Sequence, residues 1–360
     1  MLENTLYRLA HDKKYVLGYF GGSITEGAGA SSPSTCYRAL VTEWFRSRYP
    51  DAEIREIQAA IGGTGSDLGM YREELDLLSK EPDLVFLEFA VNDGGVPYER
   101  ILRQGETILK KLYAHNPYAE VVILLTTTGS VCALLEKGGE YVSRSAYFTL
   151  AHHYAIPAID VGDPLHYAVI RAGGDFHTYT TDTVHPNDAG YAIYTKTITE
   201  QLTIWLDETT VPDMPAKAVL PEPLCPMLDL DARMIDCGAL DGLTTDGFAM
   251  VEETMCGRYP RYFAGAKPGD SFSFTFTGKS AGFYWMLAKD AGDVVVTVDD
   301  GEAMPLRAWD HYCKAFNRAG PSFFAHDLPY GTHTVTVKIS DDKAEESEGH
   351  AIRIGCILVS

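Results

Sequence analysis

The first two hundred residues alternate between two hydrophobic periods, and this alternation restricts the possible folds more than any other feature of the chain. Apolar runs typical of buried strands occupy residues 15–20, 53–60, 83–90 and 121–128, with a weaker run at 156–161. Helical patterns lie between these runs and after the last one, at residues 37–49, 66–80, 98–115, 140–155 and 187–206. Strands that alternate with helices predict a parallel sheet covered by helices on both faces. We therefore expect a three-layer, flavodoxin-like α/β domain over residues 1–208.

The pattern changes after residue 208. Residues 209–228 contain five prolines and show no period, which predicts a linker. Residues 229–360 contain segments such as "DSFSFTFTG" and "THTVTVKIS", which alternate with a period near two between Gly, Asp and Pro turns. This alternation predicts a second domain, an antiparallel β-sandwich such as a jelly roll.

The charge and the cysteines limit the possible partners and the location. A formal net charge of −20 works against binding to nucleic acid or to an anionic membrane surface. The N-terminal segment "MLENTLYRLAHDKK" lacks the apolar run of a secretory signal. The seven cysteines are scattered and form no C-x-x-C pair, which favours free thiols. We expect a cytoplasmic protein that binds a neutral or weakly polar small molecule.

Glycine-rich segments follow the first two strands, but neither has the residues of a phosphate-binding loop. In "GGSITEG" the spacing from Gly22 to Gly27 is that of a P-loop, yet Ala28 and Gly29 occupy the places of the Lys-Ser/Thr pair. In "GGTGSDLG" the third glycine of a dinucleotide-binding fingerprint falls on Leu68.

A metal site is a weaker alternative. Asp182, His185 and Asp188 recur at steps of three, a spacing that metal ligands can use, and His152 is adjacent to His153. No other segment adds ligands to these, so we expect no metal.

A serine nucleophile fits these segments better. Ser23 directly follows the first strand, and a serine hydroxyl needs a general base before it can attack a carbonyl. His185 is the candidate base, because Asp182 three residues earlier can hold its other ring nitrogen. Pro186 and a helix that starts with an Asn-Asp cap would keep this segment in place.

Acyl transfer also requires hydrogen-bond donors for the oxyanion. The candidates are the backbone N–H of Ser23, a glycine N–H in "GGTGS" and the side-chain amide of Asn92. Glycine would let the substrate oxygen approach closely, and an asparagine amide donates without adding charge. Taken alone, each of these glycine and asparagine residues is equally typical of a turn.

The order of these features resembles the SGNH (GDSL-type) hydrolase superfamily. The blocks read "FGGSITEG", "AIGGTGS", "FAVNDGG" and "DTVHPND", and the resemblance covers roughly residues 14–208. Two positions depart from the pattern. Gly22 replaces the aspartate of the family's Gly-Asp-Ser, and Ala90 replaces the glycine usual before x-Asn-Asp.

The resemblance implies a role for each residue. Ser23 resembles the nucleophile, His185 the base and Asp182 the carboxylate partner of that base. Ser23, Gly63 and Asn92 resemble the oxyanion-hole donors, with Gly63 chosen over Gly62 because it lies three residues before Ser66. The implied reaction is a double displacement through an acyl-enzyme, without metal or organic cofactor.

The second domain suggests the substrate. A β-sandwich similar to carbohydrate-binding modules accompanies the SGNH domain in two-domain bacterial carbohydrate O-acetyl esterases, although there it precedes the hydrolase domain. This resemblance implies a small acylated carbohydrate as substrate. Aromatic side chains hold sugars, and the candidates here are Trp309, expected to be exposed, and Trp285. The small, polar segment "GAGASSPSTCYRA" after Ser23 favours acetate over long acyl chains.

Two alternatives remain open. One is a general short-chain carboxylesterase or thioesterase. The other is a non-catalytic carbohydrate-binding protein that keeps the hydrolase fold.

Overall fold

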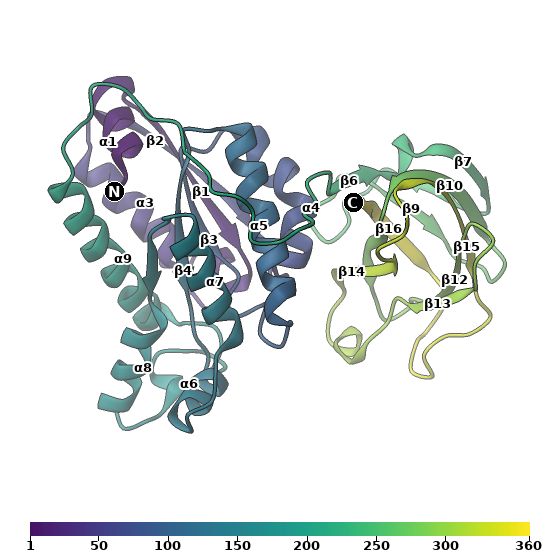
Figure 1. The fold of residues 1–360 in the computed structure, drawn as a ribbon. Coiled ribbons are helices and arrows are strands. Elements are labelled where there is room, and N and C mark those ends of the chain that lie inside the picture. Colours follow the sequence, from purple (N-terminus) through teal and green to yellow (C-terminus); the bar gives the residue numbers. More distant parts are fainter. The chain divides into compact units, whose positions relative to one another are not determined.

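The computed structural model describes residues 1–360 and divides them into two compact units, Met1–Leu230 and Asp231–Ser360. In the first unit, five parallel strands form one sheet in the order β2-β1-β3-β4-β5 (Figure 1). The strands are β1 (Lys14–Gly21), β2 (Glu53–Ala60), β3 (Leu84–Glu88), β4 (Glu120–Leu125) and β5 (Ala158–Asp160). The parallel three-layer fold expected from the sequence is confirmed, and its strand order is that of flavodoxin-like proteins.

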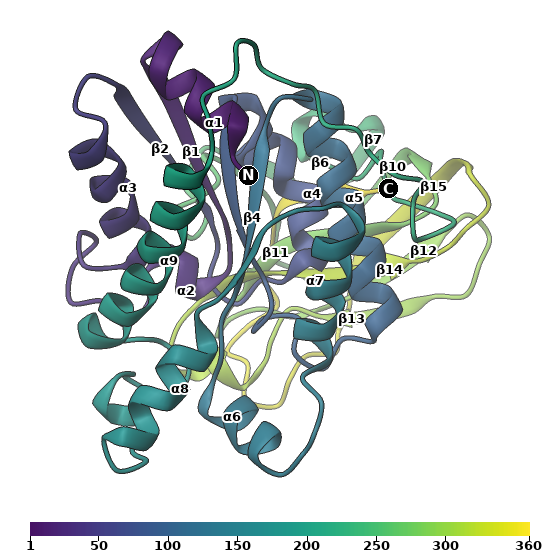
Figure 2. The ribbon, with the colours of Figure 1, turned by 60° about the vertical axis from the view of Figure 1, so that its left-hand side comes forward.

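Helices cover both faces of this sheet (Figures 1 and 2). One face carries α3 (Tyr37–Arg48), α8 (Gly162–Arg171) and α9 (Asp188–Glu208), whose apolar side chains pack on Tyr15, Leu17 and Tyr19 of β1. The other face carries α4 (Ser66–Asp76), α5 (Tyr98–His115) and α7 (Val142–His153), and α5 contacts both of the others. The remaining helical segments are α1 (Glu3–Tyr7), η1 (Arg8–Asp12), α2 (Ser23–Glu26), η2 (Leu78–Lys80), α6 (Gly129–Glu136) and η3 (Phe176–Thr178).

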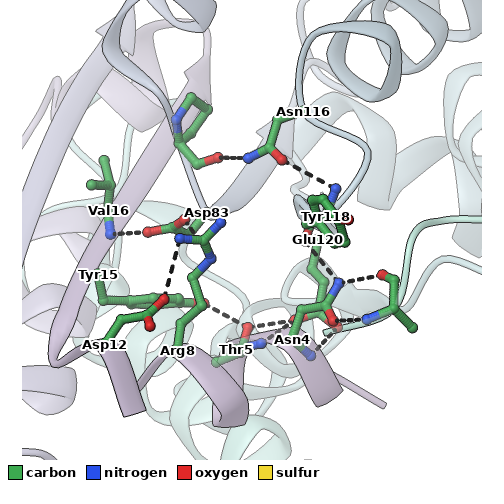
Figure 3. A network of polar contacts seen from close by, with 12 residues as sticks. Asn4, Thr5, Arg8, Asp12, Tyr15, Val16, Asp83, Asn116, Tyr118 and Glu120 are labelled. Atoms are coloured by element: carbon green, nitrogen blue, oxygen red, sulfur yellow. Dashed lines mark hydrogen bonds and ion pairs between the residues drawn. The ribbon is translucent and has the colours of Figure 1, made fainter. Parts of the chain in front are cut away.

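A polar network closes the amino-terminal edge of the sheet (Figure 3). Glu120, the first residue of β4, accepts hydrogen bonds from the backbone N–H groups of Asn4 and Thr5 and from the Thr5 hydroxyl. Asp83, just before β3, accepts the Val16 N–H and pairs with Arg8 at 3.1 Å. The N-terminal helical segment is thereby fixed to the starts of the strands. The opposite edge of the sheet, where the strands end, is not covered by this network.

The proline-containing segment 209–228 has no helix or strand, yet it is hydrogen bonded to the first unit. Asn4 exchanges two hydrogen bonds with Ala216, and Glu106 of α5 accepts the backbone N–H groups of Leu224 and Cys225 at 2.6 and 2.7 Å. Burial raises the pKa of the Glu106 carboxyl, but the hydrogen bonds that it accepts from Tyr154 and from this segment lower that pKa by more, so the net shift is downward. The segment is therefore held as part of Met1–Leu230.

The second unit consists of two antiparallel sheets that share one apolar core. One sheet has the order β13-β12-β15-β10-β7, the other β14-β11-β16-β9-β8, with β6 also paired to β16. The predicted sandwich is confirmed. Its elements are β6 (Arg233–Asp236), η4 (Cys237–Ala239), β7 (Asp241–Asp246), β8 (Ala249–Val251), β9 (Tyr262–Gly265), β10 (Ser271–Gly278), β11 (Ala281–Leu287), β12 (Asp293–Val298), β13 (Met304–Arg307), η5 (His311–Lys314), β14 (Arg318–Ala325), β15 (Gly331–Ile339) and β16 (Ile352–Val359).

None of the helices combines the length and the hydrophobicity that crossing a lipid bilayer requires.

Candidate active site

The three sequence blocks that follow strands β1, β2 and β3 meet at the carboxyl edge of the sheet. β1 lies between β2 and β3, so the segments that begin at Ser23, Gly63 and Asn92 leave three neighbouring strands. The order 2-1-3 is also where the direction of strand addition reverses, and open α/β sheets bind their ligands at that point.

A continuous chain of hydrogen bonds joins Ser23, His185 and Asp182. Ser23 Oγ lies 2.8 Å from His185 Nε2, and His185 Nδ1 lies 2.7 Å from Asp182 Oδ2. Residues 162 positions apart in the sequence are thus in direct contact. Each distance is that of a normal hydrogen bond, so the hydroxyl, the imidazole and the carboxylate are arranged for proton transfer from Ser23 to the ring.

The turn that carries Asp182 and His185 fixes both side chains. Asp182 Oδ1 accepts the backbone N–H groups of Val184 and His185 at 3.1 and 2.8 Å, which leaves Oδ2 for the imidazole. Partial burial raises the pKa of Asp182, but the hydrogen bonds to its carboxylate lower that pKa by more, so the net shift is downward. Thr183 takes a left-handed φ of 67° and its carbonyl accepts the Gly129 N–H at 2.8 Å. The turn is therefore set by its own carboxylate and by α6.

Contacts between α9 and the loop after Ser23 hold the two halves of the site together. The Tyr191 hydroxyl donates to the carbonyls of Ile24 and Ala28 at 3.0 and 2.7 Å. Asp188 accepts hydrogen bonds from Ser31 and from the Thr35 hydroxyl. These two helix residues, which were not identified from the sequence as positioning groups, hold the loop against the helix.

The same loop packs against the histidine turn. Gly29 has a φ of 87°, and a Cβ on it would lie 2.4 Å from the Pro186 carbonyl oxygen. Both the conformation and the close approach require glycine there.

The spacing of Asp182, His185 and Asp188 does not produce a cluster of metal ligands. Asp188 is engaged by Ser31 and Thr35, and no group of three His, Cys, Asp or Glu side chains is placed to hold an ion.

Of the candidate oxyanion donors, the Asn92 amide lies against Gly22, the residue before Ser23, and Gly63 follows Gly62, which lies against the Ser23 side chain. The Ser23 N–H is the first of helix α2, where no intrahelical acceptor exists, and its N-cap Gly22 supplies no side-chain acceptor. The Gly62 N–H already donates to Glu26 Oε2 at 2.8 Å, so the next N–H is that of Gly63. Gly63 has a φ of 72° and open space where a Cβ would be. Glycine adopts this left-handed backbone without strain, and its missing Cβ leaves that space open.

Two buried carboxyl groups beneath the site were not identified from the sequence. Glu88, the last residue of β3, accepts hydrogen bonds from Thr25 and Thr126 at 2.9 and 2.6 Å and from the Gly22 N–H. Asp93 accepts the Ser66 N–H at 2.9 Å and the Tyr147 hydroxyl at 2.7 Å. The available signal was their position: each is a carboxylate that ends or follows a fully apolar strand.

Burial raises the pKa of Glu88 to about 7 and that of Asp93 to about 6, in each case against the opposing effect of their hydrogen bonds. The folded chain keeps protons that the unfolded chain releases near pH 4. The stability that these two protonated carboxyl groups contribute is therefore complete below about pH 4, and it is lost as the pH rises through 6 and 7.

We expect the melting temperature of the wild type to fall more between pH 5 and pH 8 than that of Glu88→Gln, whose neutral amide does not titrate. One pKa unit corresponds to about 1.4 kcal/mol, so the difference amounts to several degrees. Thermal unfolding at both pH values measures it, with the exposed Glu140→Gln as the matched control. Equal slopes for wild type and Glu88→Gln would show that Glu88 is ionised throughout.

Of the two tryptophans assigned to sugar binding in the second unit, the structure rules out Trp285, and sugar contact at Trp309 stays a prediction. Trp285 of β11 is completely buried, because the inner face of β11 forms the sandwich core, and its Nε1 donates to Ser322 Oγ at 3.0 Å. Trp309 is half-buried and packs on the same core instead of standing exposed. The exposed aromatic side chains that follow Trp309 in the sequence are Tyr312 and Phe316, at 50% and 54% exposure.

A hydrogen-bonded serine, histidine and aspartate at the carboxyl edge of a parallel sheet is the arrangement of a serine hydrolase. Residues 19–193 match the GDSL-like Lipase/Acylhydrolase family, and this part of the chain is a domain of that family. The chain is accordingly a carboxylic ester hydrolase.

Solved structures extend the similarity to both units. The chain is similar to two crystal structures of a two-domain esterase (CEX) active on acetylated mannans, one of them co-crystallised with mannopentaose. Each match covers 100% of this chain and 95% of the esterase chain. Their TM-scores are 0.86 and 0.83, and their sequence identities 23% and 24%. These matches show a common fold through the hydrolase domain and the β-sandwich. No curated protein sequence matches the chain.

Proposed function

We propose that this protein hydrolyses short acyl esters, foremost acetyl groups on oligosaccharides, through a Ser23 acyl-enzyme. The observation that carries the proposal is the chain of hydrogen bonds from Ser23 Oγ through His185 to Asp182, at 2.8 and 2.7 Å. A serine beside a base that is itself oriented by a carboxylate is the arrangement that nucleophilic catalysis needs.

In the first step, Ser23 Oγ attacks the ester carbonyl and His185 Nε2 takes the hydroxyl proton. Asp182 holds the proton on Nδ1 and stabilises the imidazolium. When the tetrahedral intermediate collapses, the alcohol leaves with the proton from Nε2 and the acyl group stays on Ser23. Water then attacks the acyl-enzyme, giving its proton to Nε2, and release of the carboxylic acid restores the Ser23 hydroxyl.

The oxyanion of each tetrahedral intermediate would be stabilised by the N–H groups of Ser23 and Gly63 and by the Asn92 amide. Ser23 N–H has no acceptor in its own helix, and Gly62 is already bound to Glu26, which favours Gly63 as the second donor. Donors fixed in advance stabilise developing charge without reorganisation.

The carbohydrate part of the proposal is supported by the common fold with an esterase active on acetylated mannans, which includes the β-sandwich. The short acyl preference is supported by the loop after Ser23. It is built from small and polar residues and is tied to α9 by Asp188 and Tyr191, so it forms no large apolar surface for a long chain.

We expect acetylated mannose and xylose oligosaccharides to release acetate, and 4-nitrophenyl acetate to be cleaved at least about tenfold faster than the octanoate, since each methylene excluded from a small pocket reduces kcat/KM severalfold. Acetate release and the rate for each chain length measure this. A faster rate with octanoate would favour a general carboxylesterase. A wild type inert to every ester would favour a carbohydrate-binding protein.

A further inference from the structure

Gly22, which stands where the family has aspartate, lies directly against the side chain of Asn92. A Cβ on Gly22 would be 1.9 Å from Asn92 Oδ1, 2.7 Å from Cγ and 3.3 Å from Nδ2. Carbon and oxygen atoms that are not bonded do not approach to such distances. The amide of Asn92 therefore occupies the space that any side chain at position 22 would need.

The main chain at Gly22 is held from several sides. Its N–H donates to the buried Glu88 carboxyl, and its carbonyl accepts the Glu26 N–H at 2.9 Å. A Cβ on the preceding Gly21 would lie 2.4 Å from Thr25 Oγ1 and 2.5 Å from the Glu88 carbonyl oxygen, so the end of β1 is also closely packed. Gly22 has a φ of −95°, which other residues adopt freely. Glycine is needed here for space and not for conformation.

The main chain at Asn92 is held as well. The following residue, Asp93, donates its N–H to the Phe89 carbonyl, and its carboxylate binds the Ser66 N–H and the Tyr147 hydroxyl. Since both backbones are fixed, a collision between positions 22 and 92 can be relieved only by moving the Asn92 side chain, which is half-buried.

We infer that Gly22 is a positioning residue for Asn92. By lacking a Cβ, it admits the Asn92 amide to a place beside the backbone of Ser23. This inference rests on the proposed function, in which that amide donates to the oxyanion. Restoring the family's aspartate at position 22 is then expected to impair the enzyme.

A double-mutant cycle tests the inference. In the wild type, Gly22→Ala is expected to lower kcat for 4-nitrophenyl acetate about 100-fold, the typical effect of losing one oxyanion donor, with KM changed less than about threefold. In an Asn92→Ala background, the same substitution is expected to lower kcat less than about threefold, because no amide is left to displace. The pH profile of kcat/KM should stay that of the wild type, because the imidazole and its partners are untouched. Gly331→Ala, where the nearest atom to a Cβ is 3.9 Å away, is the control.

Equal losses of kcat in both backgrounds, or no loss in either, would overturn the inference. Thermal unfolding gives a second reading that needs no activity. Gly22→Ala is expected to lower the melting temperature with Asn92 present and to lower it much less with Asn92→Ala. Failure of the proposed function would appear differently, as a wild type without turnover or a fully active Ser23→Ala. In that case the melting temperatures decide the inference: coupling between positions 22 and 92 supports it, and equal shifts contradict it.

Discussion

Replacing Ser23 by alanine is expected to lower kcat/KM for 4-nitrophenyl acetate by about 10⁴-fold or more, since serine hydrolases that lose the nucleophile keep only the contribution of binding and the oxyanion hole. The fold should be unaffected. Ser23 is half-buried and the hydrogen bond of its hydroxyl is to His185, which is itself partly exposed. We therefore expect the melting temperature to change by less than about 3 °C, the size typical of a surface substitution. Initial rates and thermal unfolding measure the two effects on the same samples.

The matched control is Ser32→Ala, which removes a half-buried hydroxyl from the same loop. It should keep full activity, because Ser32 bonds only within its loop, to Thr35 and Ser34. Full turnover by Ser23→Ala would mean that another group attacks the ester. A large fall in melting temperature would mean that Ser23 is needed for the fold.

The sequence predicted the first unit well wherever a single period extended over a whole element. The strands at β1 and β2 and the helix α5 were recognised almost to the residue, because buried strands and amphipathic helices leave strong local patterns. Helices α6 and α8 were not recognised, since α6 is short and only Cys132 of it is buried. In such elements, tertiary contacts decide the structure more than local pattern does.

The site shows the same division. The residues named from the sequence are those whose chemistry is visible in their type, as with Ser23 and His185. Positions whose role depends on a neighbour far along the chain could not be found in this way. Trp285 and Trp309 have the composition of a sugar platform, but the sheet turns one into the core and packs the other on it. Gly22 is informative only once Asn92 is seen beside it.

Asp182→Asn is expected to lower kcat by about 10⁴-fold, as for the corresponding change in serine proteases, although it removes only one charge. The reason lies in how the carboxylate is shared. Oδ1 accepts two backbone N–H groups, which can bond only to an oxygen, so the carboxamide oxygen must take that place. The NH₂ group then faces His185 Nδ1 in place of Oδ2. Facing a donor, Nδ1 must be unprotonated, and the proton moves to Nε2, where it prevents the ring from accepting the proton of Ser23.

This argument separates orientation from charge. In Asp182→Asn the turn keeps both backbone hydrogen bonds, so we expect its melting temperature to stay close to that of the wild type. Asp182→Ala loses them along with the carboxylate, so it should be both inactive and less stable. Single-turnover acylation by 4-nitrophenyl acetate measures the chemical step directly and should show the same loss as kcat. If Asp182→Asn acylated at the wild-type rate, the tautomer of His185 would not depend on Asp182, and another group would have to hold the proton on Nδ1.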